Sequence, residues 1–78
     1  MTALITLTGK IEYVPMGTGA WALLTDDGVT YEIYNGEPIA IQQEGLAVSL
    51  TGILRDDVMS LAAIGPIIEV TSFERADP

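Results

Sequence analysis

Two pairs of adjacent carboxylates, Asp26-Asp27 and Asp56-Asp57, are the residues whose types most suggest chemistry. Paired carboxylates can bind Ca²⁺ or Mg²⁺, or serve as a general acid and a general base. Neither pair has the spacing of an EF-hand loop, and aspartate is common in turns because its side chain hydrogen-bonds the nearby backbone. We therefore predict turn roles for both pairs, with no metal site and no cofactor. A composite site would require the two loops to meet.

Histidine and cysteine are absent from the chain. The protein thus lacks the usual general base near neutral pH, the commonest transition-metal ligand and any thiolate nucleophile. The segment Gly17-Thr18-Gly19 lacks the lysine and the spacing of a phosphate-binding loop. These absences predict a protein that is not an enzyme and has no catalytic residues.

The charge balance restricts the partners. Eleven acidic residues against three basic ones (Lys10, Arg55 and Arg75) give a formal net charge of −8. Nucleic-acid binding needs cations that displace counterions from phosphates, so this charge disfavours nucleic acid, and it disfavours anionic membranes as well. There is no apolar stretch long enough to span a membrane and no signal-peptide pattern. The sequence predicts a cytoplasmic protein.

Alternating apolar and polar residues predict one domain over residues 1–78, made mainly of short strands. Gly9 and Gly52 interrupt two of these strands, and a glycine inside a strand is typical of a bulge or a sharp bend. The polar tail at 74–78 is expected to fray. We expect strands at residues 3–14, 20–25, 29–34, 46–54 and 67–73, and a further strand segment at 58–64.

A short helix is expected over residues 35–45, with Pro38 at its first position. Its apolar residues Ile39, Ala40 and Ile41 would plug one end of a small barrel. Five strands with a helix between the third and the fourth form the OB arrangement. We therefore predict a mainly β, five-stranded OB-like barrel. The alternative is an SH3-like barrel, which usually lacks the helix.

The strand and turn residues also resemble a known pattern. Residues 19–28 (GAWALLTDDG), Tyr31-Glu32, the spaced Gly45, Val48 and Gly52, and residues 65–70 (GPIIEV) are similar to a recurrent pattern in small bacterial OB-like β-barrel proteins of unassigned function. The resemblance implies an OB-like fold. It implies no activity and no functional residues.

Our functional hypothesis is a non-catalytic binding or adaptor module that acts through protein–protein contact, with a protein partner or in a homo-oligomer. Trp21 and Tyr31 alternate into the expected core, whereas Tyr34 falls on the opposite face. Arg55 could grip a carboxylate or phosphate, or form a surface ion pair with its neighbouring aspartates. Alternation assigns several apolar residues to the outer faces: Leu4, Val14, Leu24, Ile53, Met59, Leu61, Ile67 and Phe73.

From these sets we select candidate binding residues. An alternative hypothesis is an OB-type binder of a small molecule or nucleic acid that uses strands two and three. The selected candidates are Tyr34, Ile53, Arg55, Met59 and Phe73.

Overall fold

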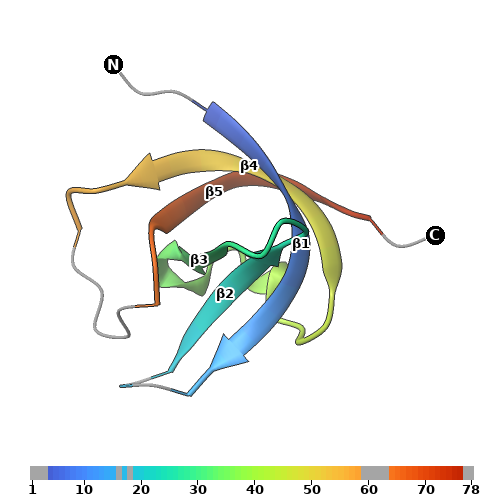
Figure 1. Cartoon of the computed structure of the whole chain (residues 1–78), viewed down its shortest axis with the longest axis horizontal. Coiled ribbons are helices and arrows are strands. Elements are labelled where there is room, and N and C mark those ends of the chain that lie inside the picture. Colours follow the sequence, from blue (N-terminus) through green and yellow to red (C-terminus); the bar gives the residue numbers. More distant parts are fainter. Residues whose placement is uncertain (1–3, 16, 18, 59–63, 77–78) are drawn as a thin grey trace.

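The computed structural model describes residues 4–15, 17, 19–58 and 64–76, and shows five strands in one mixed sheet that closes into a ring (Figure 1). The order around the ring is β1-β2-β3-β5-β4, and only the β3–β5 pair is parallel. The five main strands predicted from the sequence are therefore present. Their bounds are β1 Leu4–Val14, β2 Ala20–Thr25, β3 Thr30–Ile33, β4 Ala47–Arg55 and β5 Ile67–Arg75.

The long strand β1 belongs to both sides of the ring because it bends at Gly9. Its residues Leu4–Lys10 pair with β4, and Gly9–Val14 pair with β2. A Cβ on Gly9 would lie 2.0 Å from the carbonyl oxygen of Leu24. The strand can approach β2 this closely only because Gly9 has no side chain, which confirms the expected bend.

The other interrupting glycine, Gly52, lies at a bulge between β4 and β5. Thr51 is opposite Ser72, but Gly52 is opposite Val70. Thr71 is therefore an extra residue in β5, with no counterpart in β4. The expected bulge exists, and its extra residue is on the strand next to the glycine.

This extra residue corrects the predicted outer position of Phe73. Val70 packs against the core before Thr71, and Phe73 packs against the core after it. One inserted residue exchanges the two faces of a strand, so strict alternation gives the wrong side for Phe73.

The other apolar residues assigned to the outer faces differ in exposure. Leu4 and Leu24 are exposed, while Val14 and Ile53 are half-buried. Ile67 is buried, with 7% of its surface exposed, so its expected exposure is wrong. It begins β5 between two neighbouring strands, with Glu32 of β3 and Arg55 of β4 directly opposite. Met59 and Leu61 lie outside the described residues.

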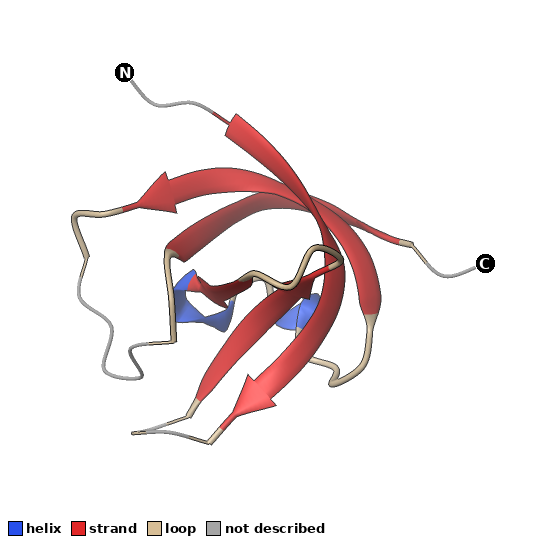
Figure 2. Cartoon of the chain, in the orientation of Figure 1, coloured by secondary structure: helices blue, strands red, loops and turns tan. Residues whose placement is uncertain are grey.

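The helix predicted over residues 35–45 is replaced by two short 3-10 turns, Tyr34–Gly36 and Ile39–Ile41 (Figure 2). Asn35 has a positive φ of 56°, and Glu37 and Pro38 are extended. A residue before proline avoids the α conformation, so a continuous helix cannot pass through this segment.

The plug predicted for Ile39, Ala40 and Ile41 is formed by Ile41 alone. Ile41 is fully buried in the core, whereas Ile39 is 78% exposed and Ala40 is also exposed. Three residues per turn spread consecutive side chains around the axis, so only one of three can point inward.

The core fills the inside of the ring. Trp21 and Tyr31 pack against it, as the sequence predicts. The last strand is longer than expected, because Glu74 and Arg75 pair with Ser49 and Val48 of β4. Most of the strand segment predicted at 58–64 lies outside the described residues. The buried core residues are Ile11, Leu23, Ile33, Ile41, Leu46, Val48, Leu50 and Ile68.

Candidate functional site

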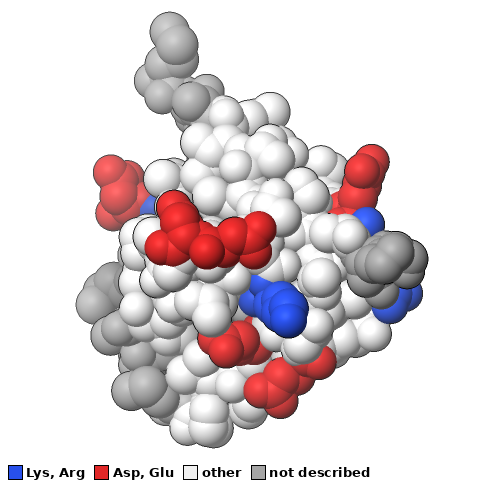
Figure 3. Space-filling view, turned by 45° about the vertical axis from the view of Figure 1, so that its right-hand side comes forward, with Lys and Arg blue, Asp and Glu red and all other residues white. Residues whose placement is uncertain are grey.

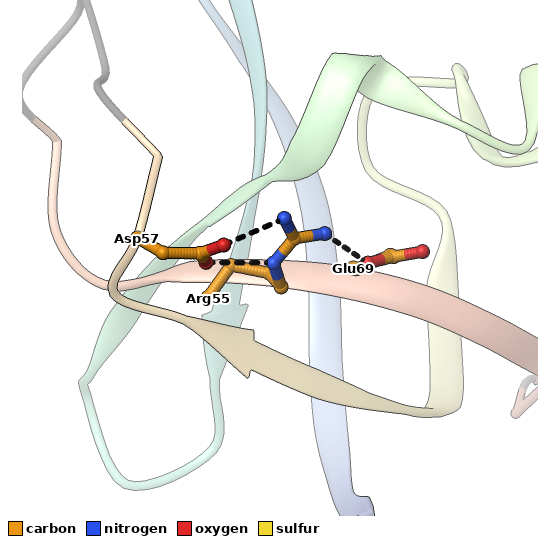
Figure 4. Close-up of polar contacts among 3 residues, drawn as sticks. All are labelled: Arg55, Asp57 and Glu69. Carbon is orange, nitrogen blue, oxygen red and sulfur yellow. Dashed lines mark hydrogen bonds and ion pairs between the residues drawn. The ribbon is translucent and has the colours of Figure 1, made fainter. Parts of the chain in front are cut away.

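Arg55, the last residue of β4, is held by two carboxylates and an aromatic ring (Figure 4). Its Nε and Nη2 donate hydrogen bonds to the two carboxylate oxygens of Asp57, at 2.8 and 3.0 Å. Its Nη1 donates a hydrogen bond to Glu69 of β5. The guanidinium carbon lies 5.2 Å from the centroid of the Tyr34 ring, a cation–π distance. Two of the candidate residues, Tyr34 and Arg55, thus meet.

These contacts tie together the ends of three elements. The hydrogen bonds to Asp57 and Glu69 raise the pKa of Arg55, and the hydrogen bond from Arg55 is the main reason that the pKa of Asp57 is lowered. The Arg55 side chain is 26% exposed. The ion-pair interpretation of Arg55 is confirmed. Because its guanidinium already has two carboxylate partners, Arg55 acts here as a structural connector.

The remaining candidate residues separate from one another. Ile53 lies two residues before Arg55 on the same strand face, and it is directly opposite Glu69. Phe73 is opposite Leu50 and faces the core. Met59 lies outside the described residues.

The two aspartate pairs have different roles. Asp27 accepts a hydrogen bond from the hydroxyl of Thr25, whose oxygen in turn accepts the N–H of Val29 at 3.0 Å. This is the turn chemistry predicted for the first pair. In the second pair, Asp57 uses its carboxylate for Arg55, so a turn role alone is wrong for that residue.

Two searches for other kinds of site gave negative results over the part of the chain that the structure describes. No group of three or more Asp, Glu, His or Cys side chains there could hold a metal ion. Among the same residues, no helix has both the length and the apolar character required to cross a membrane.

A surface rich in hydroxyl groups covers the outer side of β1, β4 and β5. Thr6 is opposite Thr51, and their Oγ1 atoms are 3.1 Å apart. The adjacent row pairs Thr8 with Ser49. We call the surface formed by these four residues and Ser72 the hydroxyl face. The sequence places Thr6, Thr8, Ser49 and Thr51 outward by alternation, but it does not show that β1 and β4 are neighbours.

The hydroxyl face carries no charge of its own in a chain with a net charge of −8. Two acidic residues of β5, Glu69 and Glu74, border it. On the outer side of β2 and β3, by contrast, Glu12 and Glu32 lie opposite Ala22 from both sides. In the view of Figure 3, the acidic side chains form separate groups with uncharged surface between them.

A shallow groove runs along the hydroxyl face at β4 and β5. Ser49, Thr51 and Ser72 line it, together with Phe73 and Glu74. Phe73 thus contributes to the wall of this groove although it packs against the core.

Comparison with known proteins adds nothing to this geometry. No protein-family model matches the chain, and the searches of curated proteins and of solved structures gave no match.

Proposed function

We propose that the protein is a non-catalytic binding module that acts through protein–protein contact on an OB-like barrel. The strand order β1-β2-β3-β5-β4, with β1 closing on β4 and β3 parallel to β5, supports the OB-like assignment. The two 3-10 turns stand where that arrangement has its helix.

The hydroxyl face is the observation that carries this proposal. The buried centre of a protein interface is depleted in charged residues, because desolvating a charge is costly. Five neighbouring hydroxyl side chains on a sheet offer hydrogen-bond donors and acceptors without that cost. An interface of ordinary size hides ~800 Å² per partner, about a sixth of the 4881 Å² that this chain exposes. One sheet face is the scale of surface that such contact needs.

The outer side of β2 and β3, which OB-type binders of nucleic acid use, is less suitable. Glu12 and Glu32 flank Ala22 there, and both carboxylates would repel phosphates. This placement adds a local reason to the global one given by the charge of −8.

Affinity capture from extract of the native cell tests the proposal. The unmodified chain, Ser72→Glu and a control, Ile39→Glu, are used as baits at equal concentration. Ser72 is exposed on the hydroxyl face, and Ile39 is exposed on the second 3-10 turn. We expect a protein that the unmodified chain and Ile39→Glu retain and that Ser72→Glu loses. Equal capture by all three folded baits would contradict the proposal.

A further inference from the structure

The first half of β1 has an open edge. Residues 4–8 pair with β4 on one side, but the pairing with β2 on the other side begins only at Gly9. In the described part of the chain, no strand therefore covers that second side of Leu4–Thr8. An open strand edge is a template for another strand.

The backbone groups that this edge presents can be identified. The carbonyl of Thr8 points away from β4, since it accepts the N–H of Asp26 at 3.1 Å. Ile11, an odd number of residues later, donates its N–H to the segment that leads into β4. Backbone groups alternate in direction along a strand. The N–H and C=O of Leu4 and Thr6 therefore point to the open side, with no strand to receive them.

A second open edge, in β5, is protected. Only Ile67 and Ile68 of β5 pair with β3, so Glu69–Arg75 has no strand beyond it among the described residues. That stretch carries charges at both ends and contains the bulge at Thr71. Charges and bulges are the features that prevent strand addition. Leu4–Thr8 has no charge, no proline and no bulge.

The open edge of β1 borders a groove with an acidic end. β2 would cover this edge if it continued in a straight line, but the chain turns away after Asp26 has bonded Thr8. A strand that takes that line would run antiparallel to β1, as β2 does, and would begin beside the turn that holds Asp26 and Asp27. The groove is lined by Thr6, Thr8, Thr25, Asp26, Asp27 and Tyr31.

We infer that an extended segment of a partner protein adds to Leu4–Thr8 as an antiparallel strand, with a basic residue at its N-terminal end against Asp26 and Asp27. This inference rests on the proposed function and names its partner by chemistry. Main-chain hydrogen bonds to Leu4 and Thr6 would supply affinity, and the carboxylates would select the basic end. A second copy fits less well, since its own Leu4–Thr8 segment offers no basic residue.

A synthetic peptide tests the inference directly. The probe is the hexapeptide Lys-Thr-Val-Thr-Val-Thr with a C-terminal fluorophore, and its binding is measured by fluorescence anisotropy. We expect Asp26→Asn to weaken binding by roughly three- to fivefold, the scale of one exposed ion pair. Asp56→Asn, the same charge change in another loop, should leave binding unchanged. A peptide with Glu in place of Lys should bind more weakly, and one with a central proline should not bind.

A second measurement does not depend on any variant. Amide hydrogen exchange of the unmodified chain should slow at Leu4 and Thr6 when the lysine peptide is present, and Thr6→Pro should abolish binding because it removes an outward N–H. No slowing at saturating peptide, or equal binding of the proline peptide, overturns the inference. A dimer that Thr6→Pro dissolves would also overturn it, by making a second copy the occupant. If native capture survives Thr6→Pro but not Ser72→Glu, the proposed function stands without this edge.

Discussion

Gly9 and Gly52 lie where neighbouring strands come too close for any side chain. A Cβ on Gly9 would be 2.0 Å from the carbonyl oxygen of Leu24, and one on Gly52 would be 2.3 Å from that of Glu69. Both obstacles are backbone atoms, so they can move only by disturbing the strand pairing. At the scale of single residues, the closure of the ring depends on these two missing side chains.

Gly9→Ala should therefore lower the free energy of unfolding by about 2–4 kcal/mol, the cost of forcing atoms into a packed site. Urea denaturation followed by circular dichroism measures it. Gly28→Asn is the control: nothing lies within 4 Å of that position, whose φ is +89°. Asparagine tolerates such a φ, so the control should cost about 1 kcal/mol or less. Equal costs for the two variants would show that β1 and β2 are not so close at Gly9.

Asp57 should make stability depend on acid. Its pKa is lowered in the folded chain, mainly by the hydrogen bond from Arg55. Its contribution is therefore complete above the unfolded value, which is near ~3.9, and is lost as the pH falls through the lower folded value. Thermal melts between neutral pH and about pH 2 should show a shallower acid-side loss for Asp57→Asn than for the unmodified chain. Parallel curves, with Asp56→Asn as the matched control, would exclude this role.

At the scale of elements, the sequence predicts the strands well because short-range patterns determine them. The hairpin around Asp26-Asp27-Gly28 needs only a turn signal between two apolar runs, and β2 and β3 form there. The mid-strand glycines indicate a bend and a bulge, both of which are present. The location of the extra residue, Thr71, depends on how β5 pairs with β4. Pairing across a long sequence separation leaves no local signal, so Phe73 was placed on the wrong side.

The segment between β3 and β4 shows a different limit of sequence reasoning. A proline near the start of an apolar stretch is typical of a helix, but the residue before it is then extended. The structure places an extended Glu37-Pro38 in the middle of the segment and divides it into two turns. The hydroxyl face and the Arg55 cluster could not be predicted for the reason that applies to Thr71. Both join residues from strands that are distant in the sequence.

Deleting Thr71 tests the account of the bulge. Without this residue, regular pairing would turn Phe73 outward, and the loss of its core packing should cost about 2 kcal/mol or more. Thr71→Ala is the control, since it keeps the chain length and removes only the hydroxyl hydrogen bond to Thr51, worth about 1 kcal/mol. Chemical denaturation compares the two variants. A deletion no more harmful than the alanine variant would mean that Phe73 does not depend on the bulge.

At the scale of the whole molecule, the charge of −8 should prevent useful binding of single-stranded nucleic acid. Fluorescence anisotropy with a labelled strand of about 20 nucleotides at roughly 150 mM salt checks this. We expect no saturation in the micromolar range. A micromolar dissociation constant, weakened by Glu12→Lys less than by Ser72→Glu, would place nucleic acid on the hydroxyl face and remove the argument from charge.

The central claim is that the hydroxyl face contacts a partner protein, and photo-crosslinking in the native cell tests it most directly. A benzophenone amino acid replaces Ser72 on the hydroxyl face in one variant and Ile39, on the turn between β3 and β4, in another. Both positions are exposed in the isolated chain. We predict that irradiation joins the Ser72 variant to one protein of fixed mass, and that the Ile39 variant gives no such product. Products from the Ile39 variant alone would contradict the account.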